Sequence, residues 1–349
     1  MSFQSALIKW YQKNKRDLPF RETKDAYKIW LSEIILQQTR VEQGLPYYYK
    51  FTERYPDVFS LARASEDEVL KLWQGLGYYS RGRNLLATAI EVAEKYNGVF
   101  PKQYSELLKL KGIGPYTAAA IASFAFDKPV FVVDGNVSRV LARLFEVQQA
   151  VNSTEGKKLL EQIANDCGDK KRPALYNYAM MELGALVCTP ASPACNLCPL
   201  QQYCQAYAHQ TQKLFPVKEQ KIKIKQRWFY YLMLIHDNKI YIQQRRGNDI
   251  WKNLYEFPLI ETKEKISEKM LQAKLKDMGI SDYTFSKPYI HQLTHRKIEA
   301  HFIVSVLKRK LKKTEEEKFY KVTIKEFQKK YAHPRLIEKF LTDYQKRNQ

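Results

Sequence analysis

The stretch CTPASPACNLCPLQQYC, residues 188–204, holds four of the five cysteines of the chain. They are spaced as Cys188-x6-Cys195-x2-Cys198-x5-Cys204. Four thiolates so close in sequence can close one metal site, because soft sulfur ligands select zinc or an iron–sulfur cluster. Disulfides are not expected, because no secretory leader opens the sequence. The spacing alone leaves zinc and an iron–sulfur cluster equally open.

The composition favours a nucleic acid as the partner. The 349 residues carry a formal net charge of +21, and the pI is about 9.5. Such a charge indicates a polyanionic ligand. No apolar run approaches the roughly 18 residues that a membrane helix needs, so we expect no membrane contact.

The first 212 residues are predicted to be all α, because apolar residues recur there at helical spacing. The predicted helices are 26–38, 41–54, 66–73, 83–96, 104–110, 115–126, 135–145, 154–166 and 174–187. The expected N-caps of four of them are Asp25, Ser65, Asp134 and Ser153.

The pattern changes after a lysine-rich segment, 213–227, which lacks a helical apolar stripe and is predicted to be a linker. Two strand-like runs, 228–236 and 239–246, flank Asp237-Asn238, which is typical of a hairpin. The remaining expected elements are a helix at 264–278, strands near 289–293 and 298–307, and a helix at 334–345. This half is therefore predicted to be α+β.

A possible phosphate-binding turn lies between two of the predicted helices, at Leu110-Lys111-Gly112-Ile113-Gly114-Pro115. Glycines permit a tight turn that exposes backbone N–H groups, and proline suits the first position of the next helix. A turn of this kind at a helix N-terminus suits a DNA phosphate. An ordinary corner between two helices is the simpler interpretation of Gly-x-Gly alone.

Two carboxylates are candidates for catalysis. Asp134 in VVDGNVSRV (132–140) precedes a helix, where a carboxylate stays ionised and would stabilise a developing sugar cation. A plain N-cap is the alternative. Glu33 lies in a helix that is apolar almost all round, where burial would raise its pKa and make it a general acid. The alternative for Glu33 is an ion pair at a helix edge.

Several of these motifs occur together in one order, and in this the chain resembles the MutY family of adenine DNA glycosylases, relatives of endonuclease III. The motifs are WLSEIILQQT (30–39), GLGYYSR (75–81), the turn with Pro115-Tyr116-Thr117, the Asp134 segment, ELGA (182–185) and the cysteine loop. The interval from the turn to Asp134 also matches the family. Motifs in a shared order are far more specific than any one of them.

The resemblance implies an all-α N-terminal helix-hairpin-helix glycosylase region with a 4Fe-4S loop, plus an α+β MutT-like (Nudix-fold) C-terminal domain. Its implied parts are a helical catalytic region at 1–212, a basic linker at 213–227 and a MutT-like 8-oxoguanine-recognition domain at 228–349. Within the helical region, a six-helix barrel would cover about 22–133. An iron–sulfur subdomain would combine 1–21 with 134–212. The cofactor implied is one 4Fe-4S cluster held by Cys188, Cys195, Cys198 and Cys204.

The family removes adenine mispaired with 8-oxoguanine or guanine after flipping it from the duplex. By resemblance, Glu33 protonates the adenine at N7 and Asp134 stabilises the oxocarbenium ion. Tyr116 corresponds to a tyrosine that bonds the catalytic aspartate, Asn136 to an asparagine beside the sugar, and Arg21 to an arginine near the adenine pocket. Further implied DNA contacts are Leu36, Gln38, Thr39, Leu76, Tyr78, Lys111, Gly112, Gly114, Thr294 and His295.

Tyr116 also bears on the reaction class. Bifunctional members of the superfamily carry a lysine there, which forms an imine and cuts the strand. Tyrosine cannot form that imine, so we expect a monofunctional enzyme. The alternatives are a bifunctional endonuclease III-like glycosylase/lyase and a non-catalytic iron–sulfur DNA-binding protein.

The C-terminal half departs from its relatives in two places. The Nudix cluster Arg-Glu-x-x-Glu-Glu that holds metal is absent, so nucleotide hydrolysis is not expected. The family's 8-oxoguanine-reading turn is typically Phe-Ser-His, whereas this chain has Leu293-Thr294-His295. In the helical half, Tyr178 also departs from the family, because relatives carry Glu or Gln at this position near the adenine pocket.

The expected partner is double-stranded DNA containing A:8-oxoguanine or A:G mispairs, bound by a monomer. We expect a cytoplasmic protein, associated with the nucleoid if it is bacterial. No motif predicts contact with a sliding clamp or with mismatch-repair proteins.

Overall fold

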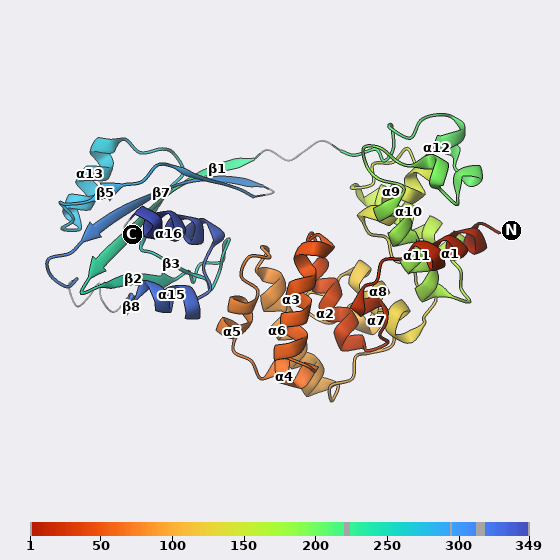
Figure 1. Cartoon of the computed structure of the whole chain (residues 1–349), viewed down its shortest axis with the longest axis horizontal. Coiled ribbons are helices and arrows are strands. Elements are labelled where there is room, and N and C mark those ends of the chain that lie inside the picture. The colour runs from red at the N-terminus through yellow and green to blue at the C-terminus, as the bar shows by residue number, and fades with distance from the viewer. Residues whose placement is uncertain (1, 220–223, 294, 312–317, 348–349) are drawn as a thin grey trace. The chain divides into compact units, whose positions relative to one another are not determined.

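The computed structural model describes residues 2–219, 224–293, 295–311 and 318–347 (Figure 1). The chain divides into two compact units. The first unit comprises Met1–Arg63 and Asn84–Gln220, and the second comprises Ala64–Arg83 and Lys221–Gln349. No helix among the described residues is long and apolar enough to cross a membrane.

The first unit is helical, as predicted. Its α-helices are α1 (Phe3–Asn14), α2 (Ala26–Leu36), α3 (Val41–Arg54), α4 (Val58–Ala62), most of α6 (Ser80–Lys95), α7 (Tyr104–Leu107), α8 (Pro115–Phe126), α9 (Gly135–Leu144), α10 (Thr154–Cys167), α11 (Pro173–Leu186) and α12 (Gln205–Ala208). Short 3-10 turns lie at Pro19–Arg21, Cys195–Leu197 and Gln201–Tyr203. Asp25, Asp134 and Ser153 cap α2, α9 and α10 through their side chains, as the sequence predicts.

The centre of this unit is the packing of α2 against α8. Helix α2 is buried on nearly every side, and Trp30 and Leu31 have no exposed surface. Helix α8 carries the run Ala118–Ala120, whose small side chains let its backbone come close to α2. The close packing of these two helices brings the polar side chains that they carry within reach of each other.

The second unit is built on a mixed sheet. Its strands are β1 (Lys225–His236), β2 (Lys239–Gln244), β3 (Tyr255–Glu256), β4 (Leu259–Thr262), β5 (Thr284–Phe285), β6 (Tyr289–Gln292), β7 (Arg296–Val306) and β8 (Tyr320–Val322). Its helices are α5 (Glu66–Leu72), which Ser65 caps as predicted, α13 (Glu268–Asp277), α15 (Ile324–Lys330) and α16 (Arg335–Arg347). Strands β1 and β7 run parallel at the centre, with Tyr231 opposite Phe302, and the other pairs are antiparallel.

Strand β1 alternates between two cores, because successive side chains of a strand point to opposite faces. Phe229 and Tyr231 face α15 and α16, whereas Tyr230 and Leu232 face α13 (Figure 1). The sheet therefore has a helix layer on each face, which confirms the predicted α+β class. The turn at Asp237-Asn238 has φ angles of 50° and 56°, and it joins β1 to β2 as the predicted hairpin.

Replacing Phe340 by alanine should destabilise the second unit. Its ring stacks on Phe302 with centroids 3.9 Å apart and an interplanar angle of 1°, and only 4% of the residue is exposed. Losing a buried phenylalanine side chain costs about 3–5 kcal/mol of unfolding free energy. Calorimetry of the full chain measures this cost. The control is Phe285→Ala, because Phe285 is 49% exposed, and equal losses in the two variants would contradict this packing.

Candidate active site

Glu33 lies on α2 inside the first unit, with only 7% of the residue exposed. The hydroxyl of Tyr116 at the start of α8 donates to its Oε2 atom over 2.6 Å. The pKa of Glu33 is raised from 4.5 to about 7, chiefly by burial and also by the charge of Asp134, although the bond from Tyr116 and the charge of Arg21 oppose the rise. The resemblance implied Asp134 as the partner of Tyr116. The observed bond runs to Glu33, because the packing of α2 against α8 brings the two side chains together.

Asp134 has a different environment at the N-terminus of α9. Its Oδ1 atom accepts from the backbone N–H groups of Asn136 (2.9 Å) and Val137 (2.7 Å), and its Oδ2 atom accepts from the Asn136 side chain at 2.9 Å. Burial raises the pKa of Asp134, and these three bonds oppose that rise. Three N–H donors form the environment of an anion. The surroundings of Glu33 therefore favour a protonated carboxyl, whereas the three donors around Asp134 favour an ionised one.

A cavity of about 740 Å³ opens beside these groups. Tyr116 and Asp134 line it, together with Lys157, Lys213 and Lys218. Since Tyr116 also bonds Glu33, one tyrosine joins the buried carboxyl to the wall of the cavity. Three lysines in the same wall suit an anionic ligand.

Arg21 is held near this site by Glu182, which also binds Arg16. Glu182 on α11 accepts from Arg21 at 2.7 Å and from Arg16 at 2.8 Å. Burial opposes ionisation of Glu182, but the two arginines together lower its pKa to about 2. Arg21 also lies over the ring of Tyr178, 5.4 Å from its centroid, and that ring stacks on Phe124. Burial and the charge of Glu33 raise the pKa of Tyr178, which indicates that this ring lies near the acid.

The turn at Lys111–Gly114 has the geometry that its glycines predict. Gly112 has a φ of 77°, and a Cβ there would lie 2.6 Å from the Cβ of Asn84. Thr88 donates to the carbonyl of Lys111. Gly114 is the N-cap residue of α8 and has open space around it, and Pro115 takes the first helical position.

Four of the residues expected to contact DNA lie at or just after the end of α2, or in left-handed backbone. In the first unit Leu36 ends α2, Gln38 follows with a φ of 54°, and the Thr39 hydroxyl donates to the carbonyl of Gln37 at 3.3 Å. In the second unit Tyr78 has a φ of 46°. Positive φ at residues other than glycine is strained and recurs at functional sites.

Three predicted site residues of the second unit share one cavity of about 550 Å³. They are Leu76, Tyr78 and His295, and Trp251 and Leu293 also line it. Leu76 is buried, whereas 48% of Tyr78 is exposed. Thr294, also predicted as a DNA contact, lies outside the described residues.

The four cysteines of the loop line one small cavity of about 30 Å³, next to Arg143. Arg143 donates to the Sγ atom of Cys188 at 3.3 Å and to the carbonyls of Thr189 and Pro190. Among the described residues, no group of three histidine, cysteine or acidic side chains is close enough to hold a single ion.

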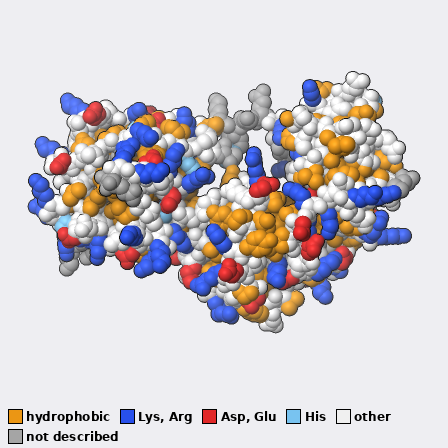
Figure 2. All heavy atoms as spheres, in the orientation of Figure 1, with side chains coloured by type: hydrophobic (Ala, Val, Ile, Leu, Met, Phe, Trp, Pro, Cys, Tyr) orange, Lys and Arg blue, Asp and Glu red, His pale blue; other side chains and the backbone are white. Residues whose placement is uncertain are grey.

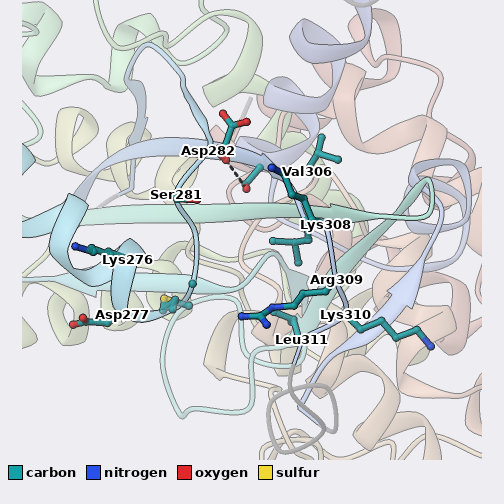
Figure 3. Close-up of a pocket in the computed structure, with 13 residues that line it drawn as sticks. Lys276, Asp277, Ser281, Asp282, Val306, Lys308, Arg309, Lys310 and Leu311 are labelled. Carbon is teal, nitrogen blue, oxygen red and sulfur yellow. Dashed lines mark hydrogen bonds between the residues drawn. The ribbon is translucent and has the colours of Figure 1, made fainter.

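A second hollow in the C-terminal unit, of about 680 Å³, lies between the end of α13 and the end of β7 (Figure 3). Four cations and two aspartates line it, namely Lys276, Lys308, Arg309, Lys310, Asp277 and Asp282. The Ser305 hydroxyl donates to the carbonyl of Asp282 at 2.7 Å. None of the predicted site residues that the structure describes lies here.

Figure 2 shows lysine and arginine side chains spread over the visible face of each unit.

Comparison with known proteins agrees with this arrangement. Residues 31–166 match the HhH-GPD superfamily of base excision DNA repair proteins, and residues 230–343 match the NUDIX domain. An adenine DNA glycosylase of Buchnera aphidicola (subspecies Baizongia pistaciae) is 38% identical over 260 residues, which cover 73% of each chain.

The chain belongs to the adenine DNA glycosylase family.

Another relative and two solved structures are similar to parts of the chain. The mouse adenine DNA glycosylase is 45% identical over 215 residues, which cover 59% of this chain and 42% of the mouse protein. A solved thermostable thymine-DNA glycosylase superposes with a TM-score of 0.55 and 29% identity, over 59% of this chain and 95% of that one. An endonuclease III bound to DNA, at 22% identity and a TM-score of 0.51, shares the fold of 61% of this chain.

Sequence reasoning did not assign Arg139 and Arg143, which join α9 to the cysteine loop. Arg139 donates to the Asn136 side chain at 2.9 Å and to the carbonyl of Cys188 at 2.7 Å. Both arginines are largely buried on α9. The signal for them was present, because two cations four residues apart interrupt the buried part of an amphipathic helix.

Glu33→Gln should change how stability depends on pH. Folding raises the pKa of Glu33 from 4.5 to about 7, so only the folded chain keeps this proton between those values. Its contribution to stability is present in full below about pH 4.5 and is lost as the pH rises through about 7. Glutamine does not titrate, so the variant should gain about 3 kcal/mol over the wild type between pH 4.5 and 8.

Denaturant unfolding of both proteins across this range measures the gain. Glu53→Gln is the matched control, because Glu53 is exposed on α3. A pH-independent difference between Glu33→Gln and the wild type would show that Glu33 titrates as an ordinary surface glutamate.

Proposed function

We propose that this protein is a monofunctional DNA glycosylase of base excision repair that hydrolyses the N-glycosidic bond of adenine mispaired with 8-oxoguanine, and also of adenine opposite guanine. The observation that carries the proposal is that Tyr116, which bonds the buried acid Glu33, lines the same cavity as the carboxylate Asp134. Family membership supports the adenine specificity. The adenine must leave the helical stack before these groups reach it.

The first step is protonation of the base. With its pKa near 7, Glu33 is protonated in about half of the molecules at pH 7, and this form donates the proton to N7 of adenine. Protonation turns the adenine into a neutral leaving group. Tyr116 fixes the carboxyl through its 2.6 Å bond to Oε2, which leaves the other oxygen to carry the proton. A surface glutamate with an ordinary pKa would have lost the proton that this step needs.

The second step is stabilisation of the sugar cation. As the C1′–N9 bond breaks, its electron pair leaves with the adenine and positive charge develops on the deoxyribose. An anionic Asp134 at about 4 Å would stabilise that charge by about 4 kcal/mol at an effective dielectric constant near 20, roughly a thousandfold in rate. Water then adds to C1′ and gives up a proton. The products are free adenine and an abasic site.

Tyr116 supports hydrolysis without strand cleavage. A lyase needs an amine that attacks C1′ and forms an imine, and the phenol of Tyr116 has no such chemistry. The position that faces the reacting centre is taken by a group that binds Glu33. The abasic site should therefore stay intact until another agent cuts it.

The DNA contacts are divided between the two units. The turn at Lys111–Gly114 offers backbone N–H groups to a phosphate, and the lysines beside Asp134 favour the same strand. In the second unit, the cavity with Leu76, Tyr78 and His295 is the proposed reader of the base opposite the adenine. Sugar and phosphate contacts hold the duplex, and this cavity supplies the choice between 8-oxoguanine and guanine.

The cysteine loop is the proposed holder of one 4Fe-4S cluster, through Cys188, Cys195, Cys198 and Cys204. All four thiols line one cavity, as the ligands of a single cluster would, and cysteine thiolates are the ligands that hold such clusters. The cluster would serve as a covalent scaffold, and Arg143 would neutralise part of its charge.

Four duplexes, with adenine opposite 8-oxoguanine, guanine, cytosine or thymine, test the reaction. Breaks should appear on the adenine strand only after alkali, and fastest opposite 8-oxoguanine. Glu33→Gln and Asp134→Asn should each slow the single-turnover rate by about a hundredfold or more while the duplex stays bound. Glu53→Gln should match the wild type. Breaks without alkali would favour a bifunctional lyase, and no base release would favour a DNA-binding protein without catalysis.

Iron and labile sulfide in anaerobically purified protein test the cluster. We expect about four of each per chain, as a 4Fe-4S cluster requires. Cys198→Ser should lose most of both, because it removes one of the four ligands. Cys167→Ser should keep them, because Cys167 does not line the cavity. One zinc ion per chain, without sulfide, would contradict the cluster.

A further inference from the structure

Six charged side chains form one network in the second unit. Its members are Arg227, Arg245, Arg296, Asp249, Glu256 and Glu261. They come from β1, β3, β4, the start of β7 and the segment after β2, so the network ties together parts of the chain that are far apart in sequence. Its three cations and three anions balance. Because the charges balance, these side chains can lie largely away from water with each charge paired to one of opposite sign.

Asp249 is the residue that all three arginines share. Its Oδ2 atom accepts from Arg227 at 2.5 Å and from Arg245 at 3.1 Å, and its Oδ1 atom accepts from Arg296. Burial opposes ionisation, but the bonds from Arg227 and Arg296 hold the pKa of Asp249 far below its usual range. Asp249 is therefore a permanent anion with one oxygen committed to Arg296.

The three arginines do not depend on Asp249 equally. Arg227 also binds Glu261 at 2.8 Å, and Arg245 binds Glu261 at 3.0 Å and Glu256 at 3.1 Å. Within the described part of the chain, Asp249 is the one carboxylate that Arg296 contacts. Removing the charge of Asp249 would thus release Arg296, while the other two arginines keep a partner.

Arg296 is the first residue of β7. Its carbonyl accepts from the N–H of Leu293 at 2.8 Å, so the two residues are held beside each other. The carbonyl of His295, next to it, accepts from Lys225 at 3.1 Å. The side chains of Leu293, His295, Arg296 and Asp249 all line the 550 Å³ cavity. The ion pair therefore lies at the point where the turn meets the cavity.

We propose that Asp249 is a positioning residue for recognition of the base opposite the adenine. It holds Arg296, and through Arg296 it fixes the turn that presents Leu293 and His295 to the cavity. This inference rests on the proposed function, because it takes this cavity as the reader of 8-oxoguanine. A turn held at both ends presents its polar groups in one geometry, and a misplacement of about 1 Å is enough to lose a specific contact.

The test uses duplexes that no glycosylase can cleave. Each carries a tetrahydrofuran abasic-site analogue opposite either 8-oxoguanine or guanine, and fluorescence anisotropy gives the Kd of the full-length protein for each. The measured quantity is the ratio of the two Kd values. Because the adenine is absent, this ratio reports only the opposite base.

We expect Asp249→Asn and Arg296→Gln each to lower the wild-type preference for 8-oxoguanine by about tenfold, the effect of losing one charge-assisted contact. Asparagine has the shape of aspartate but lacks its charge. Glu261→Gln is the matched control, because it weakens the bonds of Arg227 and Arg245 and leaves Arg296 paired. It should keep the preference, and Arg296→Lys should restore part of what Arg296→Gln loses.

Three results would overturn the inference. They are an unchanged ratio in both Asp249→Asn and Arg296→Gln, an equal loss in Glu261→Gln, and a wild type that binds the two duplexes equally. If Asp249→Asn fails to fold, Arg296→Gln still decides, because 35% of the Arg296 side chain is exposed. A wild type that prefers 8-oxoguanine but releases no adenine would refute the hydrolysis and leave the positioning role standing.

Discussion

The burial of one carboxyl group, that of Glu33, is the constraint on which the catalytic unit depends. An ionised carboxylate inside an apolar helix pair is costly, so the group keeps its proton or finds a donor. Here it does both, because its pKa rises to about 7 and Tyr116 donates to it. That solution requires α2 to be apolar on nearly all sides and α8 to be thin enough to approach it. The apolar packing of α2 against α8 and the raised pKa of Glu33 thus have the same cause, which is the burial of this side chain.

The same fold gives the second carboxyl the opposite character. Asp134 stands at a helix start, where backbone N–H groups are available, and it accepts from three donors. Two carboxyls that share a site repel when both are ionised, and each environment settles which one carries the charge. Helix α9 also links this site to the cysteine loop, because the Arg139 side chain bonds both the Asn136 side chain and the carbonyl of Cys188. The loop therefore braces the residue that holds the anion.

A feature could be predicted from the sequence when the residues that determine it lie close together along the chain. Helices with a polar cap and an apolar stripe, such as those after Asp25 and Asp134, were predicted because these signals lie within a few residues. The Asp237-Asn238 hairpin was predicted for the same reason. The helices Phe3–Asn14 and Val58–Ala62 were missed. The bond from Tyr116 to Glu33 could not be read from the sequence, because the two residues are 83 positions apart and only tertiary packing joins them.

The second unit shows why a fold does not settle a function. A Nudix hydrolase needs carboxylates that are free to bind a metal ion, since hard cations prefer clustered oxygen ligands. In this chain Asp249, Glu256 and Glu261 each bind an arginine, and Glu256 is 2% exposed. Carboxylates that are paired with arginines in this way hold β3, β4 and the segment after β2 together, and they are not free to bind a metal ion. Under the proposed function, this unit holds a binding surface in place and the helical unit carries out the hydrolysis.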